Sequence, residues 1–171
     1  MNITNFEFKA RTENLEEQEK KLLTLSPEFI GEDHQTDTYF NVATGRLKLR
    51  EGNIENALIQ YNRQDLAGGK QSDILLYKHQ SDPSLKEILV KVHGIKTVVT
   101  KKRRIYFLEN VKFHFDRVEG LGTFIEAEAI DLTGSIGIEN LKAQCDKYIV
   151  FFNIATEDFI KVSYSDMLME T

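Results

Sequence analysis

Two glutamates, Glu126 and Glu128, stand two residues apart in the segment FIEAEAI (124–130). Alternate side chains of a β-strand leave the same face, so on a strand both carboxylates would point to one side. On a helix the same spacing would send them to different sides, and EAEA is also a good helix-forming pattern. The preceding segment VKFHFDRV (111–118) alternates apolar and polar residues, which favours a strand. Because like charges so close repel each other, the pair is a candidate for binding a divalent cation.

The two segments are predicted to form a β-hairpin across the glycine-containing stretch EGLGT. With a three-residue loop, 120–122, Asp116 would lie opposite Glu126 and His114 opposite Glu128, all on one face. Three acids would then share one surface. A loop of two or four residues would instead put the apolar face of one strand beside the acids, which is a worse arrangement.

Other predicted strands also carry charges of both signs on one face. Glu7 and Lys9 alternate with phenylalanines, and Lys48 and Arg50 alternate with leucines. The charged face could look at solvent, as in many antiparallel sheets. Alternatively, the sheet closes into a barrel with the charges inside and helices over its apolar outer face. A charged interior would hold phosphate oxygens through its cations and a hard divalent cation through its acids.

The elements that would position these side chains are mainly strands, with three helices. The predicted helices span about 12–25, 83–93 and 138–153, and the second begins with an Asp-Pro pair and is followed by Gly94. We expect one α+β domain over residues 1–171. The predicted strands are Ile3–Arg11, Thr36–Asn41, Arg46–Glu51, Ala57–Arg63, Ile74–His79, another strand pair beginning in 95–110, and the two hairpin strands.

Composition and charge exclude several classes of protein. The 171 residues are 41% hydrophobic and 29% charged, with no apolar run long enough to span a bilayer. The N-terminus lacks the pattern of a secretory signal. A single cysteine, Cys145, rules out an internal disulfide framework, fits a reducing compartment and is expected to pack in the core. The net charge of −5 argues against a general nucleic-acid surface, so we expect a cytoplasmic protein that binds neither nucleic acid nor membranes.

Several motifs, taken in order along nearly the whole chain, resemble those of the CYTH superfamily, also called triphosphate tunnel metalloenzymes. Within that superfamily the sequence is most similar to class IV adenylate cyclase-like proteins. Any one motif is weak, but their order and spacing make the resemblance specific. The motifs are FEFKAR (6–11), TDTYF (36–40), GRLKLRE (45–51), LIQYNR (58–63), VVTKKRRIY (98–106), FDRVEGLGTFIEAEA (115–129) and SYSDML (163–168).

The resemblance implies a closed eight-stranded antiparallel β-barrel flanked by helices, whose tunnel binds ATP or another triphosphate together with Mg²⁺ or Mn²⁺. It assigns catalytic roles to Lys9 and Asp116, the latter by orienting a basic residue or holding a metal-bound water. In VVTKKRRIY the family spacing places Lys101 and Arg103 inward, rather than Lys102 and Arg104. The implied metal ligands are Glu7, Glu126 and Glu128, and the implied triphosphate-binding residues are Lys9, Lys48, Arg50, Arg63, Lys101 and Arg103.

One position departs from the family pattern. The first glutamate of the family's ExExK strand is Asn5 here, while Glu7 and Lys9 are in place. An amide oxygen can bind a hard cation but lacks the charge that compensates the metal. We therefore expect weaker binding at one metal position, or a single metal, beside an intact triphosphate site. His34 and His114 are expected to be polar wall residues rather than general bases.

Four functions remain open at this point. The first is a class IV-type adenylate cyclase, in which the ribose 3′-hydroxyl of ATP attacks the α-phosphorus and pyrophosphate leaves; the resemblance also suggests a homodimer. The second is an inorganic tripolyphosphatase or a thiamine triphosphatase, in which water is the nucleophile in the same tunnel. The third is a non-catalytic binder of nucleotide or polyphosphate, motivated by Asn5. The fourth is a barrel for an apolar ligand, whose tunnel would be lined by Phe6, Phe8, Leu47, Leu49, Phe113 and Phe115.

Overall fold

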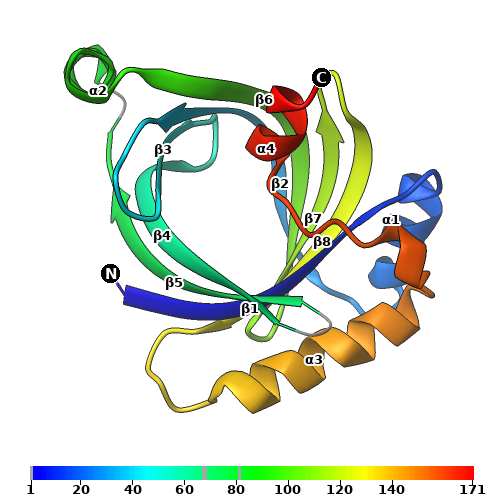
Figure 1. Cartoon of the computed structure of the whole chain (residues 1–171). Helices are drawn as coiled ribbons and strands as arrows, with labels where there is room; N and C mark the ends of the chain where they lie inside the picture. Colours follow the sequence, from blue (N-terminus) through cyan, green and yellow to red (C-terminus); the bar gives the residue numbers. More distant parts are fainter. Residues whose placement is uncertain (1, 67–68, 81) are drawn as a thin grey trace.

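The strands of the computed structural model, which describes residues 2–66, 69–80 and 82–171, close into one antiparallel barrel. Around the barrel the order is β1-β5-β4-β3-β2-β6-β7-β8, and Figure 1 looks into its opening. The predicted α+β fold with a closed eight-stranded barrel is therefore confirmed. The strands are β1 (Asn2–Arg11), β2 (Glu28–Phe40), β3 (Arg46–Glu51), β4 (Asn56–Leu66), β5 (Gly69–Lys78), β6 (Ile95–Leu108), β7 (Val111–Val118) and β8 (Gly122–Asp131).

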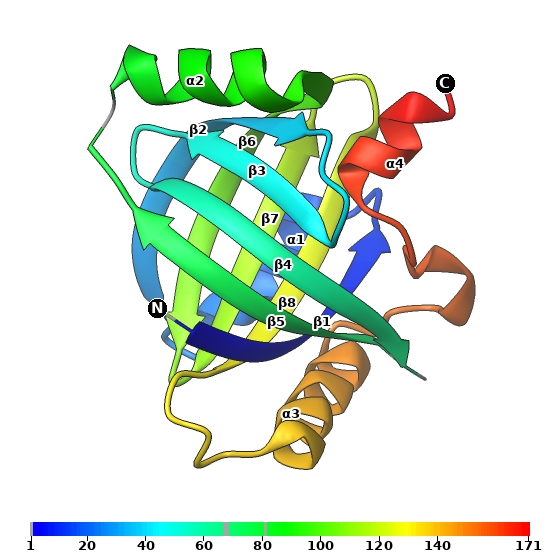
Figure 2. The same cartoon turned by 60° about the vertical axis from the view of Figure 1, so that its left-hand side comes forward.

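The helices lie outside the barrel or at its rim (Figures 1 and 2). They are α1 (Leu15–Leu23), α2 (Pro83–His93), α3 (Ile138–Phe151) and α4 (Tyr164–Met169), with a short 3-10 turn at Thr156–Asp158. Helix α2 has the predicted bounds, and the Asp82 carboxylate accepts a hydrogen bond from the Ser84 amide at its start. In the described part of the chain, no helix combines the length and the apolar character needed to cross a membrane.

The hairpin of β7 and β8 differs from the prediction in its register. His114 lies opposite Glu126, whereas Asp116 lies opposite Phe124. The loop has three residues, as expected, but it is 119–121, one position earlier than predicted, with Gly120 at φ 77°. A three-residue loop moved by one position shifts every partner by two, so each side chain keeps its face. The acids therefore still share one surface, with different neighbours.

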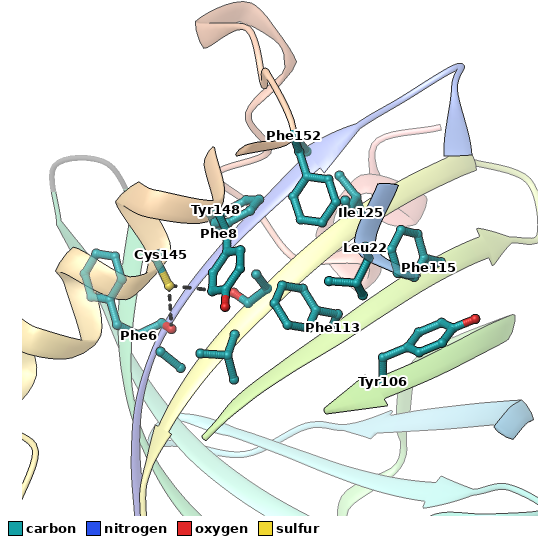
Figure 3. Packing of buried hydrophobic residues seen from close by; sticks show 14 of the residues in the cluster. Phe6, Phe8, Leu22, Tyr106, Phe113, Phe115, Ile125, Cys145, Tyr148 and Phe152 are labelled. Atoms are coloured by element: carbon teal, nitrogen blue, oxygen red, sulfur yellow. Dashed lines mark hydrogen bonds between the residues drawn. The ribbon is translucent and has the colours of Figure 1, made fainter. Parts of the chain in front are cut away.

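The main hydrophobic core lies outside the barrel, between the outer faces of β1, β7 and β8 and the helices α1 and α3. Figure 3 shows Phe6, Phe8 and Phe113 in this cluster, where the Phe113 ring packs edge-on against Tyr148 at 4.7 Å between centroids. Cys145 is buried here, as predicted, and its Sγ donates to the Phe6 carbonyl at 3.2 Å. Because these side chains point away from the interior, the hypothesis of a barrel lined by them is wrong. The same holds for Leu47 and Leu49, which pack with residues of α2.

The C-terminal segment is fixed against one end of the barrel. The Ile160 amide donates to the Lys9 carbonyl at 2.8 Å, and Arg46 Nη2 lies 2.8 Å from Asp166 Oδ2 in α4. Ser163 caps α4 by accepting from the Asp166 amide. Figures 1 and 2 show α4 beside the barrel opening. Its first residue, Tyr164, contacts Asp116 of β7 and Lys9 of β1.

Candidate functional site

The charged faces of the strands point into the barrel and line a cavity of about 740 Å³. Pockets for small molecules typically measure roughly 300–1,000 Å³. Of the two arrangements that the alternation allowed, charges toward solvent and charges inside a barrel, the structure has the second. The predicted site residues that line this cavity are Glu7, Lys9, Lys48, Arg50, Arg63, Lys101, Arg103, Glu126 and Glu128.

Strand β6 has the register that the family spacing indicated. Lys101 and Arg103 are buried in the interior, at 3% and 4% exposure. Lys102 is exposed, and the Arg104 guanidinium bonds Glu19 of α1 on the outside of the barrel. One strand thus supplies two interior cations and two exterior ones at alternating positions.

A buried carboxylate that the sequence did not single out, Asp37 on β2, holds three of the cations. The Arg50 guanidinium donates to both Asp37 oxygens at 2.9 and 2.8 Å, and Lys101 Nζ lies 2.8 Å from Oδ2. Lys48 Nζ is 3.5 Å away. Burial alone would raise the pKa of Asp37, but the three cations hold it well below its usual value. Glu55 accepts a further hydrogen bond from Arg50 Nη1 at 3.3 Å, but it is shared with Lys112, so the two carboxylates face four cations. Burial lowers the pKa of Lys101 to about 7.

Asp116, on the inner face of β7 beside Tyr164, fixes Arg103. It is fully buried and accepts hydrogen bonds from Arg103 Nε and Nη2 at 2.7 and 2.6 Å. The Tyr164 hydroxyl donates to the same carboxylate at 2.8 Å. From this fixed position Arg103 Nη2 also reaches Glu126 Oε2 at 3.2 Å. Asp116 therefore orients a basic residue, one of the two roles considered for it.

The carboxylates meet where β1 and β8 pair. Glu7 lies opposite Glu128, and Lys9 lies opposite Glu126. Burial, together with the negative charge of Glu126, raises the pKa of Glu7 to about 7. Burial opposes ionisation of Glu126 as well, but the positive charges of Lys9 and Arg103 hold its pKa well below the usual range. This part of the cavity concentrates negative charge within a lining that carries charges of both signs.

The donor set here fits a divalent cation. One ligand atom each from His114, Glu126 and Glu128 lies within 4.8 Å of the others. Asn5 donates its amide N–H to Glu128, and its Oδ1 is buried with no hydrogen-bond partner among the described residues. Carboxylate and amide oxygens are ligands of Mg²⁺ and Mn²⁺. Glu7, the third predicted ligand, adjoins this group through its contact with Glu126.

Lys70 is a further buried cation that the sequence did not indicate. It lies between the predicted strands Ala57–Arg63 and Ile74–His79, but β5 already begins at Gly69 and turns Lys70 inward. Burial and the positive charges of Arg63 and Lys9 lower its pKa to about 8. The signal in the sequence is the alternation of Lys70, Ser72 and the apolar residues that follow, which is hidden by the polar character of 69–73.

The two ends of the cavity differ in chemistry. At one end, inward-facing Val99, Val118 and Phe124 pack with Tyr164, whose ring lies 4.0 Å from Lys9 Nζ. Toward the other end, the inner wall formed by β1, β4 and β5 is apolar, and it pairs Ile3 with Ile74 and Ile59 with Leu76 across neighbouring strands. Lys48 lies opposite Ile59 on the neighbouring strand, so charged side chains adjoin this apolar wall directly.

Comparisons with known proteins agree with this geometry. The family model of the CYTH domain matches residues 4–133. The chain belongs to the CYTH domain family. This confirms the resemblance inferred from the sequence motifs. Comparison with curated proteins finds no match.

Solved structures similar to this CYTH protein cover nearly its whole length. The PH1012 protein from Pyrococcus horikoshii OT3 is 27% identical, with a TM-score of 0.80 over 95% of this chain and 98% of that chain. A candidate adenylate cyclase from Vibrio parahaemolyticus is 17% identical, with a TM-score of 0.79 over 96% and 97%. HpAC1 from Hippeastrum, a candidate adenylyl cyclase with a dominant triphosphatase activity, is 15% identical, with a TM-score of 0.67 over 99% and 96%. The protein therefore has the CYTH triphosphate-tunnel fold.

Proposed function

We propose that this protein is a metal-dependent enzyme that breaks a phosphoanhydride bond of a bound triphosphate. The observation that carries the proposal is the placement of buried cations and a carboxylate pair within one enclosed cavity. Buried charges are costly unless they are paired or bind a ligand. Here two carboxylates, Asp37 and Glu55, are shared by four cations, so phosphate oxygens would complete the pairing of Lys48, Arg50 and Lys101.

Each charged group has a defined task in this proposal. Lys9, Lys101 and the guanidinium of Arg50 bind phosphate oxygens, and Asp37 and Asp116 hold the guanidiniums so that their donors are oriented before the substrate arrives. Glu126 and Glu128, with Glu7 and Asn5 beside them, would hold the divalent cation. That cation neutralises phosphate charge and acts as a Lewis acid when bound.

Two reactions break such a bond. Our first candidate is the class IV-type cyclisation of ATP, in which the ribose 3′-hydroxyl attacks the α-phosphorus and pyrophosphate leaves; the sequence motifs and the Vibrio structure support it. The second is hydrolysis of the terminal phosphate, supported by the fold shared with HpAC1. In both, Lys9, Arg50, Lys101 and Arg103 bind the departing phosphate groups and stabilise their charge.

The apolar wall favours an organic triphosphate over inorganic triphosphate. Ile3, Ile59, Ile74 and Leu76 would pack against the organic group, while the phosphates extend toward the end packed by Tyr164. Inorganic triphosphate would leave this wall in contact with water. ATP and thiamine triphosphate both have the required combination of an aromatic group and a triphosphate.

The deciding experiment is a parallel incubation of the purified protein with Mg²⁺ or Mn²⁺ and ATP, thiamine triphosphate or inorganic triphosphate. Cyclic AMP with pyrophosphate would identify the cyclase, and nucleoside or thiamine diphosphate with phosphate would identify the hydrolase. Glu126→Gln should reduce turnover roughly a hundredfold or more, because it removes a charged ligand of the cation. Glu139→Gln, an exposed glutamate on α3, is the matched control and should leave turnover unchanged.

The rival is a non-catalytic binder, motivated by Asn5. It predicts that the wild type binds ATP without turning over any of the three substrates, while Asn5→Glu gains activity. That pair of results would overturn the proposed enzyme. Turnover by the wild type that is lost in Glu126→Gln would exclude the binder.

A further inference from the structure

We infer that His114 is a ligand of the metal site and makes that site selective for first-row transition-metal ions over Mg²⁺. The inference rests on the proposed function in one respect, which is that the carboxylate pair binds a divalent cation. It adds a nitrogen ligand that the family pattern of glutamates does not include, and it predicts which class of metal the protein prefers.

The position of His114 carries the first step. It lies directly opposite Glu126 across β7 and β8, with Nδ1 at 3.3 Å from Glu126 Oε2. Its ligand atom is within 4.8 Å of those of Glu126 and Glu128. Two ligands of one ion, with bonds of about 2.1 Å, lie at most about 4.2 Å apart. A small movement of the side chains therefore brings all three onto one cation.

The lack of other partners carries the second step. His114 is 2% exposed, and its Nε2 has no hydrogen-bond partner in the described part of the chain. Asn5 is 1% exposed, and its Oδ1 also has no hydrogen-bond partner among the described residues. The amide nitrogen of the same side chain donates to Glu128. Unsatisfied groups so deeply buried are rare because each loses its hydration without compensation. A cation between Glu126 and Glu128 would give both groups a ligand role.

The surroundings of Glu126 argue against a simple ion pair with His114. Arg103 Nη2 already contacts the same Glu126 oxygen at 3.2 Å, and Lys9 lies opposite Glu126 on β1. Lys112, on the same face of β7 as His114, is paired with Glu55 instead. Glu126 therefore needs no further positive charge from a protonated imidazole, and the neutral ring can serve as a metal ligand.

The chemistry of the donor set decides the metal class. Sites made only of carboxylate, carbonyl and water oxygens suit Mg²⁺, whereas imidazole suits first-row transition metals. A site with one imidazole and two carboxylates would bind Co²⁺ or Mn²⁺ more tightly than Mg²⁺. The preference should depend on the imidazole, because Glu126 and Glu128 serve both kinds of ion.

Calorimetric titration of metal-free protein with Co²⁺ and with Mg²⁺, in the absence of triphosphate, tests the inference. Wild type should bind Co²⁺ at least roughly tenfold more tightly than Mg²⁺, and the visible absorption of bound Co²⁺ should change in position or intensity in His114→Asn, because it depends on the ligand set. His114→Asn should weaken Co²⁺ binding roughly tenfold or more and change Mg²⁺ binding far less. His114→Asp, which makes an all-oxygen site, should retain Mg²⁺ binding and reduce the preference for Co²⁺. His34→Asn removes an exposed histidine and is the matched control.

Each outcome has a defined meaning. If His114→Asn lowers the affinity for Co²⁺ and for Mg²⁺ equally, the histidine has a structural role and the inference is wrong. If the variant keeps its Mg²⁺ affinity and loses only Co²⁺ affinity, it is folded and the inference holds. Unchanged Co²⁺ affinity in His114→Asn, or equal loss in His34→Asn, overturns the inference as well. Failure of the proposed function is separate, because the protein could bind Co²⁺ through His114 and still turn over no triphosphate.

Discussion

The inner and outer faces of the same three strands have opposite chemistry. On β1, Phe6 and Phe8 point outward into the cluster covered by α3, while Glu7 and Lys9 point inward. Strands β7 and β8 repeat this arrangement, with phenylalanine, isoleucine and alanine outside and histidine and glutamates inside. A single residue step along a strand therefore separates a side chain of the core from a side chain of the site.

This difference separates stability from function. Many small barrels fill their interior with apolar side chains, which form the core. Here α1 and α3 supply apolar partners on the outside, so burial of hydrophobic surface does not require a filled interior. The interior can then keep charged groups that are partly paired with one another and remain available to a ligand. Changes on the outer face should thus affect unfolding, and changes on the inner face should affect binding.

The largest expected effect on stability is at Phe113, on the outer face. Its ring is fully buried and packs edge-on against Tyr148, so Phe113→Ala removes a large buried side chain and leaves a cavity. The free energy of unfolding should fall by about 3–5 kcal/mol, measured by urea denaturation. Val150→Ala on α3, at an exposed position, should change it by less than about 0.5 kcal/mol. A loss at Phe113 no larger than that control would show that the outer cluster is not the main core.

The next largest expected effect is on ATP affinity, at Arg50 on the inner face. Arg50→Ala should weaken ATP binding roughly tenfold to a hundredfold, because charged hydrogen bonds to phosphate are lost. Asp37 keeps Lys101 and Lys48 as partners in this variant, so unfolding should change less than for Phe113→Ala. The affinity of the variant for AMP should fall much less than its affinity for ATP, because AMP places fewer phosphates among the interior cations.

Binding constants for ATP and AMP, measured by calorimetry on both proteins, check this prediction. Lys102→Ala is the matched control, because Lys102 is a cation on the outer face of β6, next to the interior Lys101. Equal losses for ATP and AMP in Arg50→Ala would mean that Arg50 does not contact the additional phosphates.

The alternation of side chains was sufficient to predict the faces of the strands, but not which face is inside. Leu47, Lys48, Leu49 and Arg50 alternate equally well in an open sheet with a wet face and in a closed barrel. Closure depends on pairing β1 with both β5 and β8, which are contacts between distant segments. The order of the motifs along the chain decided between the two arrangements, because local periodicity carries no information on closure.

The site residues that the sequence missed depend on contacts of the same long-range kind. Asp37 stands in a recognised motif, but its role follows from three cations on β3 and β6 that the fold brings to it. Tyr164 reaches Asp116 only because the C-terminal segment folds back over the barrel end. The hairpin register was wrong by two residues because two positions of a three-residue loop preserve the same faces.

The smallest expected effect is a pH dependence of binding from the crowded interior cations. The pKa of Lys101 is about 7 in the free protein, so its amine is largely neutral above that pH. Bound phosphate favours the ammonium form, so binding takes up a proton. Affinity for ATP, measured without metal, should therefore fall as pH rises above 7, by at most about tenfold per pH unit for one proton.

Calorimetry in buffers of different ionisation enthalpy measures this proton uptake directly, and variants separate the contributing groups. Lys70, with a pKa of about 8, and Glu7, with a pKa of about 7, also favour anion binding in their protonated forms. Both should therefore contribute to proton uptake when ATP binds. Lys101→Arg keeps the positive charge at every pH, so it should reduce proton uptake near pH 8 while Lys70 and Glu7 maintain the remainder. If Lys101→Arg takes up as many protons as wild type, Lys101 is already charged in the free protein. In that case its ion pair with Asp37 outweighs the burial and the neighbouring cations, and the interior is less frustrated without its ligand than the inner-face comparison implies.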